Sequence, residues 1–109
     1  MTEELERRLA INEDVFRTVN EGIRRGQWPG EPDAPVAFRC ECARLGCNEL
    51  IGLTPSEYEQ VRAGPRRFAL ARGHETPLVE TVVEVRGEYV IVEKVGVGGE
   101  VADARDPRS

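Results

Sequence analysis

The sequence is poor in the features that identify the commonest classes of protein. Its 109 residues include one tryptophan, two tyrosines, three phenylalanines and a single histidine, so aromatic side chains contribute little to a core. No apolar run approaches the roughly 18 residues that a membrane-spanning helix needs. The first residues, MTEELERR, are too charged for a secretory signal peptide. These absences predict a cytoplasmic protein with a thin hydrophobic core and no membrane partner.

Positive charge is also scarce. The formal net charge is −5, and the basic residues are fourteen arginines and the single lysine Lys94. Residues 2–25 carry five basic against six acidic side chains, and residues 27–109 carry ten against fourteen. A protein held to nucleic acid by neutralising phosphates needs the opposite balance, so we expect no nucleic-acid partner. The length fits one domain, or one small domain with an appendage.

An amphipathic helix is predicted at the N-terminus, over residues 1–26. Thr2 is a suitable N-cap, acidic residues follow it, and two arginines precede Gly26, which can end the helix. Apolar residues repeat along it in heptads, so that one interpretation docks the helix on its own domain. The other pairs it with a second copy, where Arg8 would face the partner's Glu13. This seam consists of Leu5, Leu9, Asn12, Phe16, Val19 and Ile23, widened by Ile11 and Val15.

The composition changes after the helix and again near the C-terminus. Residues 27–35 contain three prolines, which predicts a linker, with Trp28 as a candidate anchor against the core. Residues 36–96 have the patterning of a folded domain. Residues 97–109 are first glycine-rich and then charged, which predicts a disordered tail.

The domain over residues 36–96 is predicted to mix strands with one short helix. Thr54 and Glu57 have the spacing of a capping box, Pro55 suits the first helical position, and Gly64 ends that helix. The last two apolar runs form a hairpin through Arg86-Gly87. The fold class is therefore α+β, with a long N-terminal helix and a small antiparallel sheet domain. The predicted strands cover residues 36–40, 49–53, 66–70, 78–85 and 88–95.

Three cysteines and the only histidine form the clearest chemical pattern. Cys40, Cys42 and Cys47 have the spacing C-x-C-x4-C, and His74 follows 27 positions later. Residues i and i+2 of an extended strand point to the same face, and the four residues before Cys47, including Gly46, can turn the chain back. Three thiolates and one imidazole are a standard closed zinc set, and soft donors favour Zn2+. A zinc ion in this site would hold the segments of the small sheet domain together.

Other features of the sequence leave alternatives open. The fourth ligand could instead be Glu49, Glu41 or a water, and the cysteines could be buried thiols without a metal. An iron–sulfur cluster usually takes four cysteines. The acidic residues of the last two strands alternate with valine, which predicts that most lie on a solvated face. These residues are Glu80, Glu84, Glu88 and Glu93.

Several segments together resemble a group of short uncharacterised proteins from high-GC actinobacteria. The resemblance covers most of residues 12–94, and the group's pattern is C-x-C-x4-C followed by a Gly-His-Glu turn. This sequence departs from the group at Ala43-Arg44-Leu45, where the group usually has glycine and acidic or proline residues. The resemblance implies a zinc site and no particular activity. The matching segments are FRTVNEGI (16–23), FRCEC (38–42), LTPSEYEQVR (53–62), PRRF (65–68), GHE (73–75) and YVIVEK (89–94).

The pattern favours a non-catalytic protein-interaction or regulatory module with a structural Cys3His zinc site. The expected partner is another protein bound through the N-terminal helix, and a homodimer is left open. The alternative is a thiol-based redox sensor that releases zinc on oxidation. A zinc hydrolase, with Glu41 or Glu75 as its base, fits less well, because three thiolates make the metal a poor Lewis acid.

Overall fold

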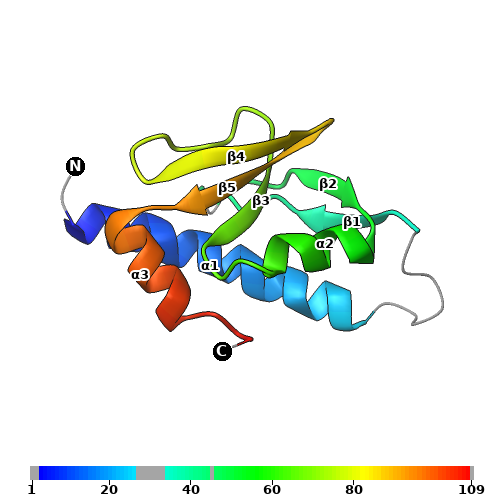
Figure 1. Cartoon of the computed structure of the whole chain (residues 1–109), viewed down its shortest axis with the longest axis horizontal. Helices are drawn as coiled ribbons and strands as arrows, with labels where there is room; N and C mark the ends of the chain where they lie inside the picture. Colours follow the sequence, from blue (N-terminus) through cyan, green and yellow to red (C-terminus); the bar gives the residue numbers. More distant parts are fainter. Residues whose placement is uncertain (1–2, 27–33, 45, 109) are drawn as a thin grey trace.

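The computed structural model describes residues 3–26, 34–44 and 46–108. The predicted α+β class is confirmed: the described residues form three helices and two small antiparallel sheets (Figure 1). The predicted cap Thr2, the anchor Trp28 and most of the linker lie outside the described residues. The elements in chain order are α1 (Glu3–Arg25), β1 (Val36–Arg39), β2 (Leu50–Leu53), α2 (Pro55–Arg62), β3 (Arg67–Ala71), β4 (Glu80–Arg86), β5 (Tyr89–Lys94) and α3 (Gly96–Ala104).

The predicted hairpin of the last two strands is confirmed. β1 pairs with β2, and β5 lies between β3 and β4 in the second sheet. The β4–β5 turn needs a residue with positive φ, which Gly87 supplies at 60°. One irregularity interrupts the β4–β5 register between Val82 and Glu84, which is the mark of a β-bulge.

The hydrophobic core lies between α2 and the two sheets. The capping box of α2 is confirmed, because the Glu57 amide donates to the Thr54 hydroxyl at 3.0 Å and the Thr54 amide to the Glu57 carboxylate at 2.8 Å. This start directs Tyr58 inward, where its ring stacks on Phe38 with centroids 4.6 Å apart. Residues Phe68–Ala71 of β3 are all buried in the same cluster. Four of the six aromatic residues, Phe38, Tyr58, Phe68 and Tyr89, are thus concentrated where the two sheets and α2 meet.

The long helix α1 docks on its own domain, along β1 and α3 (Figure 1). The face predicted for that docking is wrong in part. Phe16 of the seam is buried, but Val15 and Val19 are 42% and 43% exposed. Glu13 is fully buried, so it is not available to Arg8 of a second copy. Within this chain, Arg8 pairs with Glu4. The buried face is mostly polar and consists of Ala10, Glu13, Asp14, Phe16, Arg17, Asn20 and Glu21.

The prediction of a disordered tail over residues 97–109 is also wrong for the part that the structure describes, residues 97–108. Gly96–Ala104 forms α3, which packs against α1, and Val101 and Ala102 are buried. Glycine lowers helix propensity, but Gly99 lets α3 approach the Arg66 side chain closely, since an added Cβ there would lie 2.5 Å from the guanidinium. Tertiary packing therefore overrides the local preference.

Opposite charges neutralise the polar face of α1. Lys94 lies fully buried between Glu13 and Glu80, and its Nζ is 3.0 Å from Glu80 Oε1. The prediction of a solvated strand face holds for Glu84 and Glu88 but is wrong for Glu80, which is 3% exposed. The single lysine of the chain is thus a core residue.

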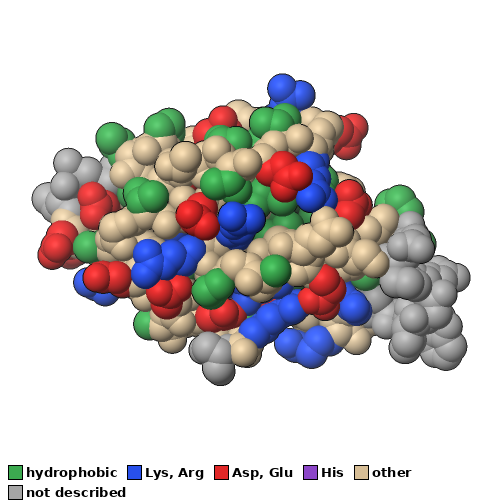
Figure 2. All heavy atoms as spheres, viewed as in Figure 1, with side chains coloured by type: hydrophobic (Ala, Val, Ile, Leu, Met, Phe, Trp, Pro, Cys, Tyr) green, Lys and Arg blue, Asp and Glu red, His purple; other side chains and the backbone are tan. Residues whose placement is uncertain are grey.

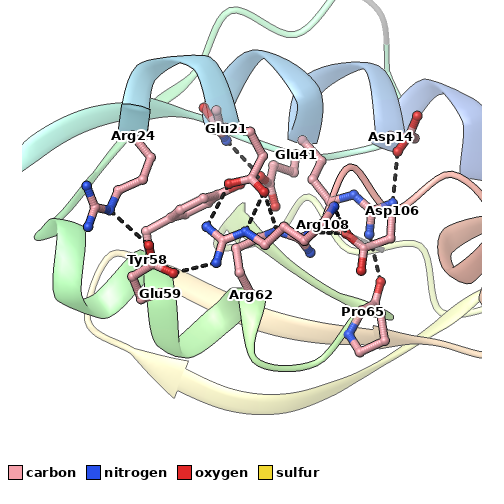
Figure 3. A network of polar contacts seen from close by, with 12 residues as sticks. Asp14, Glu21, Arg24, Glu41, Tyr58, Glu59, Arg62, Pro65, Asp106 and Arg108 are labelled. Carbon is pink, nitrogen blue, oxygen red and sulfur yellow. Dashed lines mark hydrogen bonds and ion pairs between the residues drawn. The ribbon is translucent and has the colours of Figure 1, made fainter. Parts of the chain in front are cut away.

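A second set of buried charges joins the C-terminal residues to α1 and α2. The guanidinium of Arg62 contacts Glu21 of α1 at 3.3 Å and also Asp106 (Figure 3). Arg108 donates to both carboxylate oxygens of Glu21. The segment after α3 is therefore held against α1 and α2 by ion pairs, which is the reverse of the predicted free tail.

The surface carries both signs of charge. On the face seen in Figure 2, acidic and basic side chains are interspersed, and hydrophobic side chains appear among them. None of the described helices has the length and apolar character needed to cross a membrane.

Candidate metal centre

The structure brings the four predicted donors together. One ligand atom each from Cys40, Cys42, Cys47 and His74 lies within 4.8 Å of every other. His74 Nδ1 is 3.5 Å from the sulfur of Cys40 and 3.6 Å from that of Cys47. Ligand atoms of a tetrahedral zinc site lie about 3.3–3.8 Å apart, given Zn–S and Zn–N bonds of about 2.3 and 2.0 Å. The cluster is therefore compatible with metal binding.

Two short turns present these donors. Cys40 follows β1 and its amide donates to the Glu49 carbonyl at 3.0 Å, while the Cys47 amide donates to the Arg44 carbonyl at 3.0 Å. Gly46 is not required for close packing in this turn, because an added Cβ there would meet open space.

His74 reaches the cluster from the turn that follows β3. Its amide donates to the Ala71 carbonyl at 3.1 Å, and Gly73 supplies the positive φ of 86° that this turn needs. One donor thus comes from a segment distant in sequence, so a bound metal would join β3 to the segment between β1 and β2.

Glu41 lies between two of the cysteines but faces away from them. Its buried carboxylate accepts hydrogen bonds from the Ala69 amide at 2.9 Å, and from Asn20 and the Tyr58 hydroxyl at 2.8 Å each (Figure 3). Its own amide donates to the Ala69 carbonyl at 2.9 Å. The carboxylate is therefore engaged by groups away from the sulfurs, and Glu41 is not a member of the donor cluster.

The other carboxylate considered for the fourth position is not part of the cluster. Glu49 is exposed, and only its backbone carbonyl contacts a cysteine segment. His74 is therefore the fourth donor that the described residues bring to the three sulfurs.

The surroundings of the cysteines shift the pKa values of Cys40 and Cys42 in opposite directions. Cys40 and Cys42 are buried, whereas Cys47 and His74 are half-buried. A hydrogen bond from the Cys40 thiol lowers the pKa of Cys42 to about 4, although burial opposes this. The same hydrogen bond, together with burial, raises the pKa of Cys40. Crowded thiolates repel one another, so a cation is needed before all three can be ionised together.

Helix α1 holds the cysteine segment through two asparagines. Asn12 donates to the Ala43 carbonyl at 3.0 Å. Asn20 accepts from the Arg39 amide and donates to the Arg39 carbonyl, both at 2.8 Å. Sequence reasoning did not assign these roles, although Asn12 stood out as the polar member of an apolar seam.

Arg39 extends the same link. Its guanidinium lies 4.8 Å from the centre of the Phe16 ring and donates to the Cys47 carbonyl at 2.8 Å. The conformation of the cysteine segment therefore depends on the docked position of α1. The docking of α1 depends in turn on the conformation of the cysteine segment.

A surface hollow of about 330 Å³ lies at the other end of α1, and none of the four donors lines it. Four of its five charged side chains are already paired, Arg24 with Glu59 and Arg108 with Glu21 (Figure 3). We therefore assign it no ligand. The lining residues are Glu21, Arg24, Arg25, Glu59, Pro107 and Arg108.

The chain matches no family model, no curated protein and no solved structure. The chemistry of the site follows from its donors: three sulfurs and one imidazole can hold a soft or borderline metal ion with all four tetrahedral positions filled.

Proposed function

We propose that this chain is a small zinc-binding protein whose Cys3His site is structural and which acts as a non-catalytic interaction or regulatory module. The observation that carries the proposal is the approach of Cys40, Cys42, Cys47 and His74 to within 4.8 Å. Zinc is the metal whose common structural sites use this donor set. Four protein donors leave no position for substrate, which favours a structural role over hydrolysis.

The size of the domain supports a structural metal. Domains of about 60 to 150 residues bury only about 60–70% of their unfolded surface, and this one, with α1 and α3 packed on it, has few aromatic side chains. A structural zinc contributes on the order of 10 kcal/mol or more of apparent binding free energy. Such a term exceeds the net stability typical of a small domain, so metal binding and folding are coupled.

The exposed side of α1 supports the interaction role. Val15 and Val19 lie on the same side of the helix and are 42% and 43% exposed. The opposite face is committed to the domain by its buried charges, so a protein partner can bind this side without undocking α1. The cytoplasmic location, the actinobacterial resemblance and the lack of a nucleic-acid partner stay predictions from the sequence.

A second candidate, a redox sensor that releases zinc, is favoured by one arrangement. Cys47 is the half-exposed sulfur, so a hydroperoxide reaches it before the buried ones. The segment it belongs to is bonded to α1 through Asn12 and Arg39. Loss of zinc would therefore loosen the docked helix, which is what a sensor requires.

Metal analysis of the purified chain and three variants tests the proposal. The parent should hold one zinc per chain, Cys42→Ser should lose most of it because a charged donor is gone, and His74→Ala should bind it more weakly. Glu49→Ala is the matched control and should retain zinc. A parent chain that contains no zinc would contradict the proposal. If His74→Ala keeps its full zinc content and Glu49→Ala loses zinc, the fourth ligand is Glu49 instead of His74.

Peroxide titration separates the two candidates. A zinc-responsive dye should report no release at low oxidant if the site is structural only. Release at low peroxide, with α1 becoming sensitive to protease at the same point, would identify the sensor instead.

A further inference from the structure

The strand β4 has an unusual exposure for a valine-rich segment. Among the described residues it pairs with β5 alone, so its other edge is open. Val82, Val83 and Val85 are 37%, 41% and 57% exposed, whereas the neighbouring residues Tyr89–Val92 of β5 are buried. Hydrophobic side chains appear along the upper rim of the molecule, where β4 lies (Figures 1 and 2). Open apolar edges of this kind are sites of strand pairing with another chain.

The charges on β4 select the occupant of that edge. Glu84 and Arg86 flank Val85, and their side chains already approach one another within the chain, with Arg86 Nε 2.9 Å from Glu84 Oε1. In an antiparallel pair, residues directly opposite one another place their side chains on the same face. A two-fold pairing centred on Val85 therefore sets Glu84 of each copy opposite Arg86 of the other. The strand is complementary to itself.

Other two-fold alignments are less favourable. Centring the pair on Glu84 or on Arg86 places that charge opposite itself, which is destabilising. Centring it on Val83 sets Arg86 opposite Glu80, whose carboxylate is buried and already paired with Lys94. The bulge between Val82 and Glu84 also confines regular pairing to the half of the strand that contains Val85.

We propose that two copies of this chain associate through β4, antiparallel and centred on Val85, so that the two β3–β5–β4 sheets continue into one. This inference goes beyond the proposed function and needs no contact with the cysteine cluster. It also leaves the exposed side of α1 available to a different protein.

Sedimentation equilibrium on the zinc-loaded full chain tests the pairing. The parent should show twice the 12.1 kDa chain mass at tens of micromolar. Glu84→Arg places like charges opposite one another at both ends and should raise the dimer dissociation constant by about tenfold or more. The double variant Glu84→Arg with Arg86→Glu restores opposite charges and should recover the dimer. Val19→Lys on the exposed side of α1 is the control and should remain dimeric.

A parent that is monomeric at every concentration would overturn the proposal. So would a dimer that survives Glu84→Arg but is lost in Val19→Lys, which would assign the contact to α1. Each variant is first checked for a cooperative melt like the parent's. Where Glu84→Arg fails that check, Val85→Lys replaces it, with the same expected loss of the dimer.

Discussion

The cysteine cluster and the charged face of α1 both bury groups that water would otherwise solvate, but they are neutralised in different ways. The cluster gathers three thiols and an imidazole from residues 40–74. The face of α1 meets countercharges from the far end of the chain, such as Arg105 on Asp14 and Arg108 on Glu21. The proposed zinc ion would neutralise the first region from solution, whereas the second region is neutralised by its own fold.

This difference predicts how each region responds to damage. Removing the ion from the cluster leaves donors that repel one another or must take up protons. Removing one partner from a buried ion pair leaves the other charge uncompensated, whereas replacing all members by neutral groups is often nearly neutral. The next experiments use that asymmetry.

Chelation should have the largest effect. A strong chelator should abolish the cooperative thermal transition of the domain, because the lost binding free energy is on the order of 10 kcal/mol. Calorimetry of the zinc-loaded and chelated protein measures it. An unchanged melt after verified zinc removal would mean that the ionic region, and not the cluster, holds the fold.

Breaking the buried lysine cluster should have the next largest effect. Lys94→Met leaves Glu13 and Glu80 facing one another without a cation and should cost about 3–5 kcal/mol of unfolding free energy. Urea denaturation measures it.

The matched control removes the whole charge set. Glu13→Gln and Glu80→Gln added to Lys94→Met should recover a large part of the loss. A single Lys94→Met that is as stable as the parent would show that the buried charges are not coupled.

The pH dependence should change more modestly. Burial and the nearby Glu80 raise the pKa of Glu13, with Lys94 opposing them. A carboxyl whose folded pKa is raised contributes stability that is fully present below its unfolded pKa, about 4.5, and is lost as the pH rises through the folded pKa. Urea midpoints from pH 4.5 upward should therefore fall less in Glu13→Gln than in the parent.

The Glu21 carboxyl gives the opposite sign and serves as the internal comparison. Burial raises the pKa of Glu21, but Arg108 and Arg62 outweigh it and lower that pKa below its usual value. The contribution of Glu21 to the free energy of unfolding is therefore present above its unfolded pKa and is lost as the pH falls through the folded pKa. Glu21→Gln should therefore flatten the acid limb of the stability curve, and a variant that instead changes the alkaline side would contradict the assignment.

The smallest effect is expected on the solvent side of α1. Arg8 and Glu4 form an exposed i,i+4 pair at 3.7 Å, and such pairs contribute about 0.3–0.5 kcal/mol. Arg8→Ala should thus shift the urea midpoint barely beyond error. A loss of several kcal/mol would show that this side of the helix is engaged in a contact that the monomer does not contain.

Local patterns predicted a good part of the structure. The capping box at Thr54, the hairpin through Gly87 and the long helix were visible because each depends on neighbours within a few residues. The cysteine spacing also predicted its cluster, since i and i+2 on an extended segment share a face. His74 joined them in the prediction as the only histidine, and the turn at Gly73 supplies the geometry.

The remaining features depend on residues that are far apart in the chain. Glu80 follows the alternation of a solvated strand, yet Lys94 and Glu13 draw it into the core. The glycine-rich start of α3 has low helix propensity, yet packing against α1 makes it helical. Neither partner could be identified from the pattern of the segment itself.

The sequence by itself determined the helix and hairpin signals, the acidic net charge and the donor set of the candidate zinc site, because these depend on composition and short spacing. Only the tertiary structure decided which face of α1 is buried and that the C-terminal residues close the fold. The physical reason is that burying a charge is unfavourable unless its partner is in place. That partner is chosen by three-dimensional proximity, which short-range patterns do not encode.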